Sequence, residues 1–278
     1  MSNDRTILIA GCSSGIGYVS ARMLQAKGWR VFATARKDAD IIRLESEGLE
    51  VFRLDYTDPI TISECVGEVA ERTKGKLFAL FNNGAYGQPG AVEDLSRATL
   101  TAQFEANVFG WHELTRDCLK LMRANGSGRI VNNSSVLGLT AMKWRGAYCA
   151  SKFAIEALSD TMRLELQGTG IYVSLIEPGP IATRFVEHAM AAFERNIDEE
   201  ASHYRQAYVR QRQRFNGGGA KRFKLPPEAV ARKLLHALES RKPRRRYYVT
   251  VPTYVMAWAR RLLPPPALDR LLDKASDQ

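Results

Sequence analysis

The fold is decided by the stretch from residue 6 to residue 17, which reads TILIAGCSSGIG. Its apolar first half is typical of a buried strand, and a helix-like stretch follows it and ends at Gly28. The glycines in between let the backbone turn sharply and approach a pyrophosphate, since no Cβ stands in the way. The helix N-terminus adds free N–H groups that favour a phosphate. An ordinary glycine-rich turn is the alternative, but the position between a first strand and a helix favours a nucleotide site.

Short apolar runs alternate with helix-like stretches along the rest of the first two thirds of the chain. Strands are predicted at 6–10, 30–34, 50–54, 77–81, 128–133 and 171–176, and helices at 16–27 and 60–73. Such alternation requires parallel strands joined by right-handed crossovers, and near-continuous apolar strands indicate a sheet covered on both faces. We therefore predict an α/β protein with a doubly wound parallel sheet, the Rossmann fold, in a single domain over residues 1–240.

The chain has 278 residues, of which 45% are hydrophobic and 25% charged, so it can bury a large core. We recognise neither a membrane-spanning run nor a signal peptide. The four cysteines are Cys12, Cys65, Cys118 and Cys149. They are scattered without a CxxC pair, which argues against a disulfide framework or a metal site and favours a reducing compartment. We expect a cytoplasmic protein.

The net charge of +10 is concentrated in basic runs at 203–224 and 241–246, and no nucleic-acid-binding motif accompanies it.

A second motif, YCASK, contains Tyr148 and Lys152. Four residues apart on a helix, these side chains share one face. A free phenol has a pKa of about 10, and we expect the nearby ammonium to lower the pKa of Tyr148. Tyr148 would then give a proton to a developing alkoxide or take one from an alcohol. A pair with this spacing is also common by chance on exposed helices, so the interpretation depends on its neighbours.

The G-x-x-x-G-x-G spacing of Gly11–Gly17 and the Tyr148/Lys152 pair together resemble the short-chain dehydrogenase/reductase family, in its single-domain branch. The resemblance covers roughly residues 5–185, and the sequence is similar to the steroid- and retinol-active members. It implies a catalytic set of Asn107, Ser135, Tyr148 and Lys152. Ser135 would orient the substrate oxygen, with Ser134 as the neighbouring alternative. Asn107 would hold a helix irregularity and a water that links the lysine to solvent, unless it is an ordinary helix-face amide.

The cofactor is predicted from the end of the second strand. Ala35 stands where an NAD enzyme of this family carries a carboxylate for the ribose 2′-OH, and Arg36 follows it. A guanidinium grips a 2′-phosphate that a carboxylate would repel, so we predict NADP(H), with Lys37 as a second candidate contact. A solvated charge at the strand end is the alternative.

The other cofactor contacts are implied by the resemblance. Asp55 matches an adenine-contacting aspartate, and residues 82–85, NNGA, resemble the motif N-N-A-G with its last two residues exchanged. Residues 178–183, PGPIAT, resemble P-G-x-x-x-T, in which Ile181 offers its backbone and Thr183 its hydroxyl to the carboxamide. The full predicted set is Gly11, Ser13, Ser14, Gly15, Ile16, Gly17, Arg36, Asp55, Asn83, Asn107, Tyr148, Lys152, Pro178, Gly179, Ile181 and Thr183.

Two segments lie outside these motifs. Residues 184–225 occupy the place of a helical substrate lid, with Gly217–Gly219 as a hinge. The lid includes Phe185, Met190, Phe193, Tyr204, Tyr208 and Phe215. These aromatic residues and the methionine suit a lipophilic substrate. Packing of the lid onto the core would explain them equally well. Residues 241–278 form a basic, amphipathic C-terminal extension. It either lies on an anionic membrane surface or packs on the same subunit or a partner, and we favour packing.

The sequence thus predicts an NADP(H)-dependent oxidoreductase that moves a hydride between nicotinamide and the carbonyl or alcohol carbon of a lipophilic substrate. By resemblance we expect a homodimer or homotetramer. One alternative is a non-catalytic regulator that senses a dinucleotide, which would need the glycine loop but not the tyrosine, lysine and serine. Another is the epimerase/dehydratase branch, which favours a G-x-x-G-x-x-G loop and a longer chain.

Overall fold

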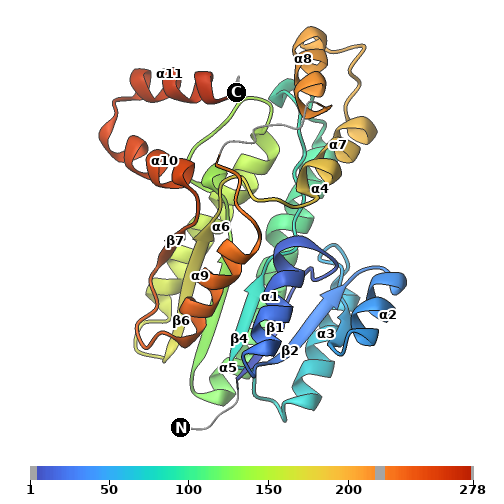
Figure 1. Cartoon of the computed structure of the whole chain (residues 1–278), viewed down its shortest axis with the longest axis vertical. Coiled ribbons are helices and arrows are strands. Elements are labelled where there is room, and N and C mark those ends of the chain that lie inside the picture. The colour runs from blue at the N-terminus through green and yellow to red at the C-terminus, as the bar shows by residue number, and fades with distance from the viewer. Residues whose placement is uncertain (1–4, 217–222, 277–278) are drawn as a thin grey trace.

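The computed structural model describes residues 5–216 and 223–276, without the side chains of 214–216. Within these residues, seven parallel strands form one sheet in the order β3-β2-β1-β4-β5-β6-β7, with helices on both faces (Figure 1). The strands are β1 (Thr6–Ile9), β2 (Arg30–Ala35), β3 (Glu50–Arg53), β4 (Ala79–Asn82), β5 (Gly128–Asn133), β6 (Ile171–Glu177) and β7 (Arg246–Tyr248). The predicted doubly wound sheet is confirmed.

The helices divide into two layers because the side chains of each strand alternate between its faces. Ile7 and Ile9 of β1 pack with α1 (Gly15–Ala26), α2 (Asp38–Ser46) and α9 (Glu228–Glu239). Leu8 and Ala10 pack on the opposite face with α3 (Pro59–Arg72), α5 (Gly110–Asn125) and α6 (Gly146–Glu165). The remaining helices are α4 (Arg97–Phe104), α7 (Phe185–Asn196), α8 (Arg205–Asn216), α10 (Val251–Leu262), α11 (Pro265–Ser276) and three short turns, η1 (Val92–Asp94), η2 (Glu105–Phe109) and η3 (Val136–Gly138).

The sheet contains a topological switch point between β1 and β4. The chain runs from β1 outward to β3 and then returns to the other side of β1 as β4. In open α/β sheets the ligand crevice lies outside the carboxyl ends of the strands at such a point. Gly11 follows β1 there and Gly84 follows β4, and a Cβ on Gly11 would lie only 2.7 Å from the Gly84 Cα. The topology therefore opens a crevice at the predicted glycine loop.

Helices α4 and α5 are joined by η2, a π-helical turn that contains the buried Asn107. Gly110 begins α5 against the loop after β3, where a Cβ would lie 2.1 Å from the Tyr56 carbonyl oxygen. Only glycine allows this close approach of helix and loop, which sets how deeply η2 sits against the sheet.

The structure also holds elements that the sequence analysis missed. Helix α2 follows β2, and β7 pairs with β6 beyond residue 240, where we had ended the nucleotide-binding fold. Strand β7 escapes prediction because it has three residues and begins on the last arginine of the charged run RKPRRR. At the C-terminus, Pro264–Pro266 ends one helix as predicted, but Pro265 also opens α11, since proline fits the first turn of a helix.

The basic run and the amphipathic helix of the C-terminal extension lie at opposite edges of the sheet. Because β7 is parallel to β6, residues 241–245 precede it at the amino edge and α10 follows it at the carboxyl edge (Figure 1). Helix α10 packs on the subunit itself, since Arg260 donates a hydrogen bond to the Leu139 carbonyl (2.7 Å) and lies over the Phe153 ring. This face of α10 thus packs on the same subunit, which is one part of the alternative that we favoured.

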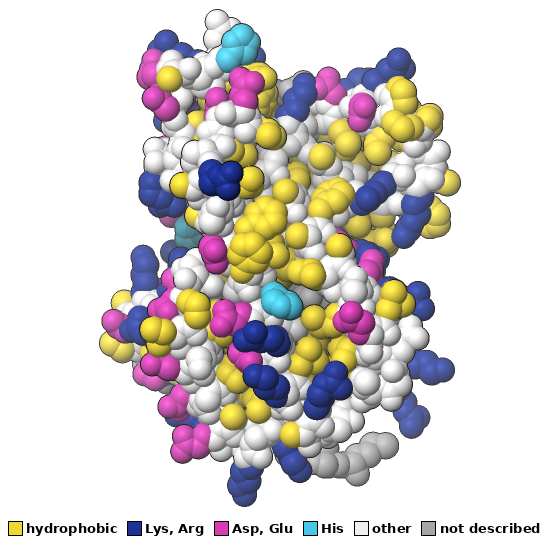
Figure 2. Space-filling model, turned by 180° about the vertical axis from the view of Figure 1, so that it is seen from behind, with side chains coloured by type: hydrophobic (Ala, Val, Ile, Leu, Met, Phe, Trp, Pro, Cys, Tyr) yellow, Lys and Arg dark blue, Asp and Glu magenta, His cyan; other side chains and the backbone are white. Residues whose placement is uncertain are grey.

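The surface carries exposed apolar side chains in two places. Figure 2 shows hydrophobic side chains gathered in the middle of the face opposite to Figure 1. Leu100 of α4, Phe109 of η2 and Leu158 of α6 are each at least 39% exposed. A second group forms a stripe along α10, where the residues recur at helical spacing: Val251, Tyr254, Val255, Trp258 and Leu262. No helix within the described residues combines the length and apolar character needed to cross a membrane.

Two glycine substitutions test the packing. Gly110→Ala should lower the free energy of unfolding by about 3 kcal/mol, because its methyl group would collide with the Tyr56 backbone. Gly67→Ala, in an open position on α3, should raise it by roughly 0.5–1 kcal/mol through lower unfolded-state entropy. Urea unfolding measures both. Equal stability of the two variants would contradict the close approach at Gly110.

Candidate active site

The glycine loop after β1 has a shape that only glycines permit. Gly11 and Gly15 have positive φ angles of 75° and 59°. A Cβ on Gly17 would lie 2.1 Å from the Gly11 carbonyl oxygen, and one on Gly15 would lie 3.0 Å from the Thr183 methyl group. A side chain at any of these positions would distort the loop or fill the crevice. The predicted loop residues are thus brought together at the switch point.

Helix α1 begins at Gly15 with its first N–H groups unclaimed by a side-chain cap. Ser14 is extended at the N-cap position and makes no capping hydrogen bond. The carbonyl of Ser13 accepts a hydrogen bond from Arg43 Nη2 at 2.8 Å. A helix N-terminus without a cap, preceded by a glycine cradle, fits the pyrophosphate of a dinucleotide. The residues of this chain therefore fit a nicotinamide dinucleotide cofactor.

Asn83 fastens the loop after β4 to the glycine loop. Its Nδ2 donates to the carbonyls of Ala10 and Gly11, both at 3.1 Å, and its Oδ1 accepts from Asn133 at 3.0 Å. Gly84, the exchanged residue of NNGA, lies against Gly11, and its carbonyl accepts a hydrogen bond from Trp111 Nε1 at 2.8 Å. The departure from N-N-A-G thus leaves the loop anchored from two sides.

Cationic side chains flank the predicted adenosine end of the crevice. Arg36 is 69% exposed, and its Nη1 lies 3.8 Å from Asp55 Oδ2. Arg43 reaches the glycine loop from α2 and is itself paired with Asp40 and Glu47. The sequence analysis missed Arg43 because it did not predict α2, and a helix periodicity in residues 38–46 is the signal that would have pointed to it.

Tyr148 and Lys152 lie in the first two turns of α6 and are both buried. Tyr148 shares a hydrogen bond with Ser135. Lys152 Nζ donates to the Asn133 carbonyl at 2.9 Å and lies 5.7 Å from the centre of the Tyr148 ring. The Trp111 ring lies 4.2 Å from Nζ, in a cation–π contact. Trp111 was missed because an apolar residue of an amphipathic helix is normally a core residue.

The ionisation of this pair differs from our expectation. Burial raises the pKa of the Tyr148 phenol, and the hydrogen bond with Ser135 opposes that rise only in part. Burial also lowers the pKa of Lys152 to about 7, against the charge of Glu156, which raises it. The expected lowering of the phenol pKa by a neighbouring ammonium is therefore wrong for the protein alone, because burial of the phenol is the largest cause and raises its pKa.

Asn107 is a structural clamp at the π-helical turn. Its Oδ1 accepts from the Tyr86 N–H at 3.2 Å, and its Nδ2 donates to the Tyr86 carbonyl at 2.9 Å and to Ser151 Oγ at 3.2 Å. These bonds join the loop after β4 to the active-site helix α6. Asn107 thus holds the segment at the irregular turn rather than lying as an ordinary amide on a helix face.

The two neighbouring serines after β5 face different partners. Ser135 is the one that bonds to Tyr148, and its Oγ also accepts from the Leu137 N–H at 3.1 Å. Ser134 faces Gly138, where a Cβ would lie 2.7 Å from Ser134 Oγ and 3.0 Å from Glu156 Cγ. The geometry therefore favours Ser135 over Ser134 as the partner of the phenol.

The loop after β6 crosses the crevice and leads into the lid. The Pro178 carbonyl accepts from the Val136 N–H at 2.8 Å, and Gly179 lies against Thr250. Ile181 pairs with Leu225, and Thr183 Oγ1 accepts from the Phe185 N–H at 3.3 Å beside Gly15. Of the predicted contacts in this loop, Thr183 thus lies beside the glycine loop, whereas Pro178, Gly179 and Ile181 contact other segments.

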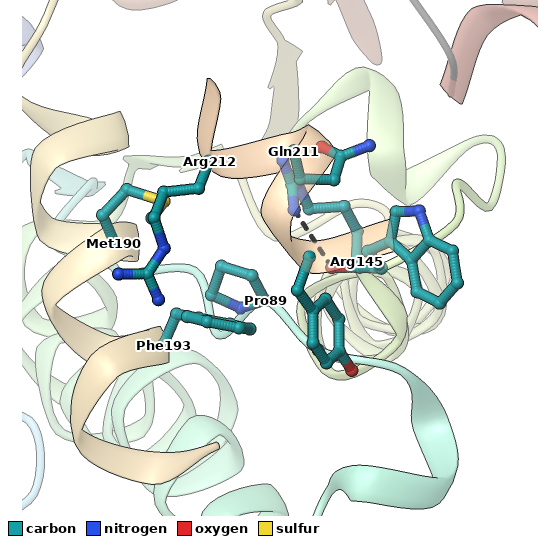
Figure 3. A pocket seen from close by; sticks show the side chains of 9 residues that line it. Pro89, Arg145, Met190, Phe193, Gln211 and Arg212 are labelled. Atoms are coloured by element: carbon teal, nitrogen blue, oxygen red, sulfur yellow. Dashed lines mark hydrogen bonds between the residues drawn. The ribbon is translucent and has the colours of Figure 1, made fainter. Parts of the chain in front are cut away.

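The lid closes on the site through aromatic contacts. The ring of Phe185 lies 5.3 Å from the Tyr148 ring. Phe193 and Tyr208, both lid residues, pack together, and the Tyr208 hydroxyl accepts a hydrogen bond from the Ala91 N–H outside the lid. Figure 3 shows Met190 and Phe193 at a hollow of about 20 Å³, which is room for one water molecule. Gly217–Gly219 and the side chain of Phe215 lie outside the described residues.

A larger hollow of about 420 Å³ lies away from the phenol, between α9 and β7. Its lining is basic and includes Arg232, Lys233 and Arg244. Tyr247 shares a hydrogen bond with His236 at its edge. This hollow does not contain the tyrosine, lysine and serine, so the candidate active site remains the crevice at the glycine loop.

Comparison with known proteins agrees with this geometry. The family model described as short chain dehydrogenase matches residues 5–193. The chain is 42% identical to the uncharacterized oxidoreductase YbbO of Escherichia coli, over 97% of this chain and 94% of the relative. It is 32% identical to human 17-beta-hydroxysteroid dehydrogenase type 1, over 88% of this chain and 77% of that enzyme. The structure of a short chain dehydrogenase/reductase from Burkholderia phymatum in complex with NAD superposes with a TM-score of 0.77, at 25% identity and over 96% and 95% of the two chains.

Proposed function

Because the chain belongs to the short-chain dehydrogenase/reductase family, we propose that it is an NADP(H)-dependent oxidoreductase that exchanges a hydride with the carbonyl or alcohol carbon of a lipophilic substrate. One observation carries this proposal. A buried phenol, Tyr148, is hydrogen-bonded to Ser135 and lies one helical turn from Lys152 beside the glycine loop. A dinucleotide-sensing regulator would need the loop alone.

In this proposal each residue has a defined part. The bound cofactor supplies or accepts the hydride. Tyr148 Oη gives its proton to the substrate oxygen during reduction, and the Ser135 hydroxyl holds the same oxygen where charge develops. Lys152, tied to the Asn133 carbonyl, supplies positive charge behind the phenol. Asn107 fixes the Tyr86 segment and Ser151, which keeps α6 in place.

Reduction is the direction that the ionisation of the site supports. Burial raises the pKa of Tyr148, so the phenol stays protonated at neutral pH and serves as an acid. Oxidation would instead require a phenolate, which the closed protein disfavours.

The preference for NADP(H) is supported by charge at the adenosine end. Ala35 offers no carboxylate to a ribose hydroxyl, and Arg36 and Arg43 approach from the ends of β2 and α2. A 2′-phosphate would meet at least one exposed guanidinium there. The relative from Burkholderia phymatum was solved with NAD, so membership of the family does not decide between the two cofactors and the assignment is supported by this chain's own residues.

A lipophilic substrate is supported by the lid over residues 184–225. Phe185 covers the phenol, so a substrate must displace this ring to reach Tyr148. The aromatic contacts of Phe193 and Tyr208 hold the rest of the lid on the core. Lid packing thus explains some of its apolar residues, and Phe185 is the one that faces the chemistry.

The surface supports two further assignments. The exposed Leu100, Phe109 and Leu158 lie on α4, η2 and α6 and suit pairing with a second copy, as a homodimer or homotetramer. The stripe on α10, with Trp258 and the neighbouring Arg261, suits peripheral contact with an anionic bilayer.

The four cysteines are buried and unpaired, in keeping with a cytoplasmic enzyme.

Tyr148→Phe tests the chemistry. It should lower kcat by about a thousandfold in NADPH oxidation against a panel of aldehydes, ketones, steroids and retinoids, because the substrate oxygen loses its proton donor. The affinity for NADPH, measured by fluorescence, should stay unchanged. Tyr172→Phe, at an exposed position on β6, is the matched control and should keep full activity. Retained turnover in the Tyr148 variant would rule out the assignment.

Arg36→Asp tests the cofactor. It should weaken NADPH binding by about tenfold or more and strengthen NAD(H) use, because a carboxylate repels the 2′-phosphate and accepts from the 2′-OH. Arg116→Asp, at an exposed position on α5, serves as the charge-matched control. An intact NADPH preference in the Arg36 variant would contradict our interpretation of Arg36.

The apolar stripe on α10 is tested by sedimentation with vesicles. The protein should bind vesicles rich in phosphatidylglycerol more than neutral ones, and the double variant W258Q/L262Q should lose at least about tenfold of that partitioning. The variant I60Q/V92Q, which removes exposed apolar residues elsewhere, should bind as the unaltered protein does. Equal binding of all three proteins would exclude a membrane role for α10.

A further inference from the structure

A buried cluster of charges begins one helical turn after the active-site lysine on α6. The guanidinium of Arg246 on β7 contacts Glu156 of α6, Glu177 at the end of β6 (2.7 Å) and Asp160 of α6 (2.5 Å). Glu177 is fully buried and Glu156 is 7% exposed, whereas the Asp160 side chain is 42% exposed. One cation thus faces two buried carboxylates, an arrangement that is costly when both are ionised.

The two buried carboxyl groups differ in their surroundings. Burial, together with the negative charge of Glu156, raises the pKa of Glu177 to about 8. Burial also raises the pKa of Glu156, but Arg246 acts against this rise. Among the described residues Glu177 Oε2 has no hydrogen-bond partner, whereas the Ser134 hydroxyl acts with Arg246 to lower the pKa of Glu156. The two carboxyl groups therefore titrate as a pair beside one guanidinium. We assign the shared proton to Glu177, the more deeply buried of the two.

Glu156 is also the acid placed to act on the active-site lysine. It follows Lys152 by four residues, so the two side chains lie on one face of α6. Lys152 Nζ is bonded to the Asn133 carbonyl and covered by Trp111, and within the described ranges no carboxylate oxygen lies within 4.0 Å of it. The charge of Glu156 nevertheless raises the pKa of Lys152 against the effect of burial.

We propose that Glu156 is a positioning residue whose carboxylate favours the ammonium form of Lys152, while Glu177 carries the proton of the buried pair. The charged and titratable groups that face this pair are Lys152 and Asp160 from α6 and Arg246 from β7. Asp160 is paired in turn with Arg163 (3.2 Å). The inference rests on the proposed function only in that Lys152 acts beside Tyr148.

The two glutamates allow a matched test, since the same change is made at two buried partners of one arginine. Glu156→Gln removes a carboxylate that is ionised, so the titration midpoint of Lys152 should fall by about one pH unit. Glu177→Gln imitates the protonated acid already present, so the midpoint should stay unchanged. The measurement is the pH dependence of the Lys152 ¹³Cε chemical shift in cofactor-free protein. The alkaline limb of the pH profile for carbonyl reduction should follow the same pattern.

A purely structural role for the cluster predicts a different outcome, because both substitutions remove one contact of Arg246 and should then behave alike. Equal shifts in the two variants, or no shift in Glu156→Gln, would overturn the proposal. A ¹³C carboxyl titration of the unaltered protein needs no variant. It should find Glu156 ionised at neutral pH and Glu177 titrating about one unit higher, and the reverse order would also overturn the proposal. If Lys152 shifts as expected but catalysis does not respond, the proposed role of Lys152 in turnover fails while this inference stands.

Discussion

The burial of Lys152 is the constraint on which the rest of the site depends. An ammonium group taken out of water costs several kcal/mol unless the protein replaces its hydration. Three parts of the fold do so: the Asn133 carbonyl at the end of β5, the Trp111 ring on α5 and the charge of Glu156 on α6. Because these parts come from different layers, the lysine is satisfied only when the sheet and both helices are packed together. The catalytic geometry is therefore as stable as the core itself.

Much of this arrangement could be predicted from the sequence because short motifs encode it locally. The glycine loop needs residues without a Cβ, so Gly11, Gly15 and Gly17 mark it, and the structure shows the collisions that any side chain would cause. Apolar runs marked six of the seven strands of the described sheet within about two residues, since buried parallel strands are nearly continuous in hydrophobicity. The spacing of Tyr148 and Lys152 marked one helix face for the same kind of reason.

What the sequence could not indicate depends on residues that are distant along the chain. Arg246 belongs to a run of like charges that is typical of a solvated loop, yet it lies between β6 and α6 because β7 adds to the sheet there. Arg43 reaches the glycine loop only through the direction of α2. Burial decides the ionisation of Tyr148 and Lys152, and spacing alone carries no information on burial, so the expected direction of the phenol pKa was wrong.

Burial also links the lid to the Tyr148 phenol. Phe185 lies against Tyr148, and the phenol is 8% exposed in the closed arrangement. Desolvation is the largest cause that raises the pKa of Tyr148. Any displacement of Phe185 by water would lower that pKa toward its ordinary value, whereas an apolar substrate in its place would preserve it. In the proposed reaction, a lipophilic substrate would thus keep the proton on Tyr148 until an oxygen that carries developing charge takes it, which would give the apolar lid a part in the chemistry as well as in recognition.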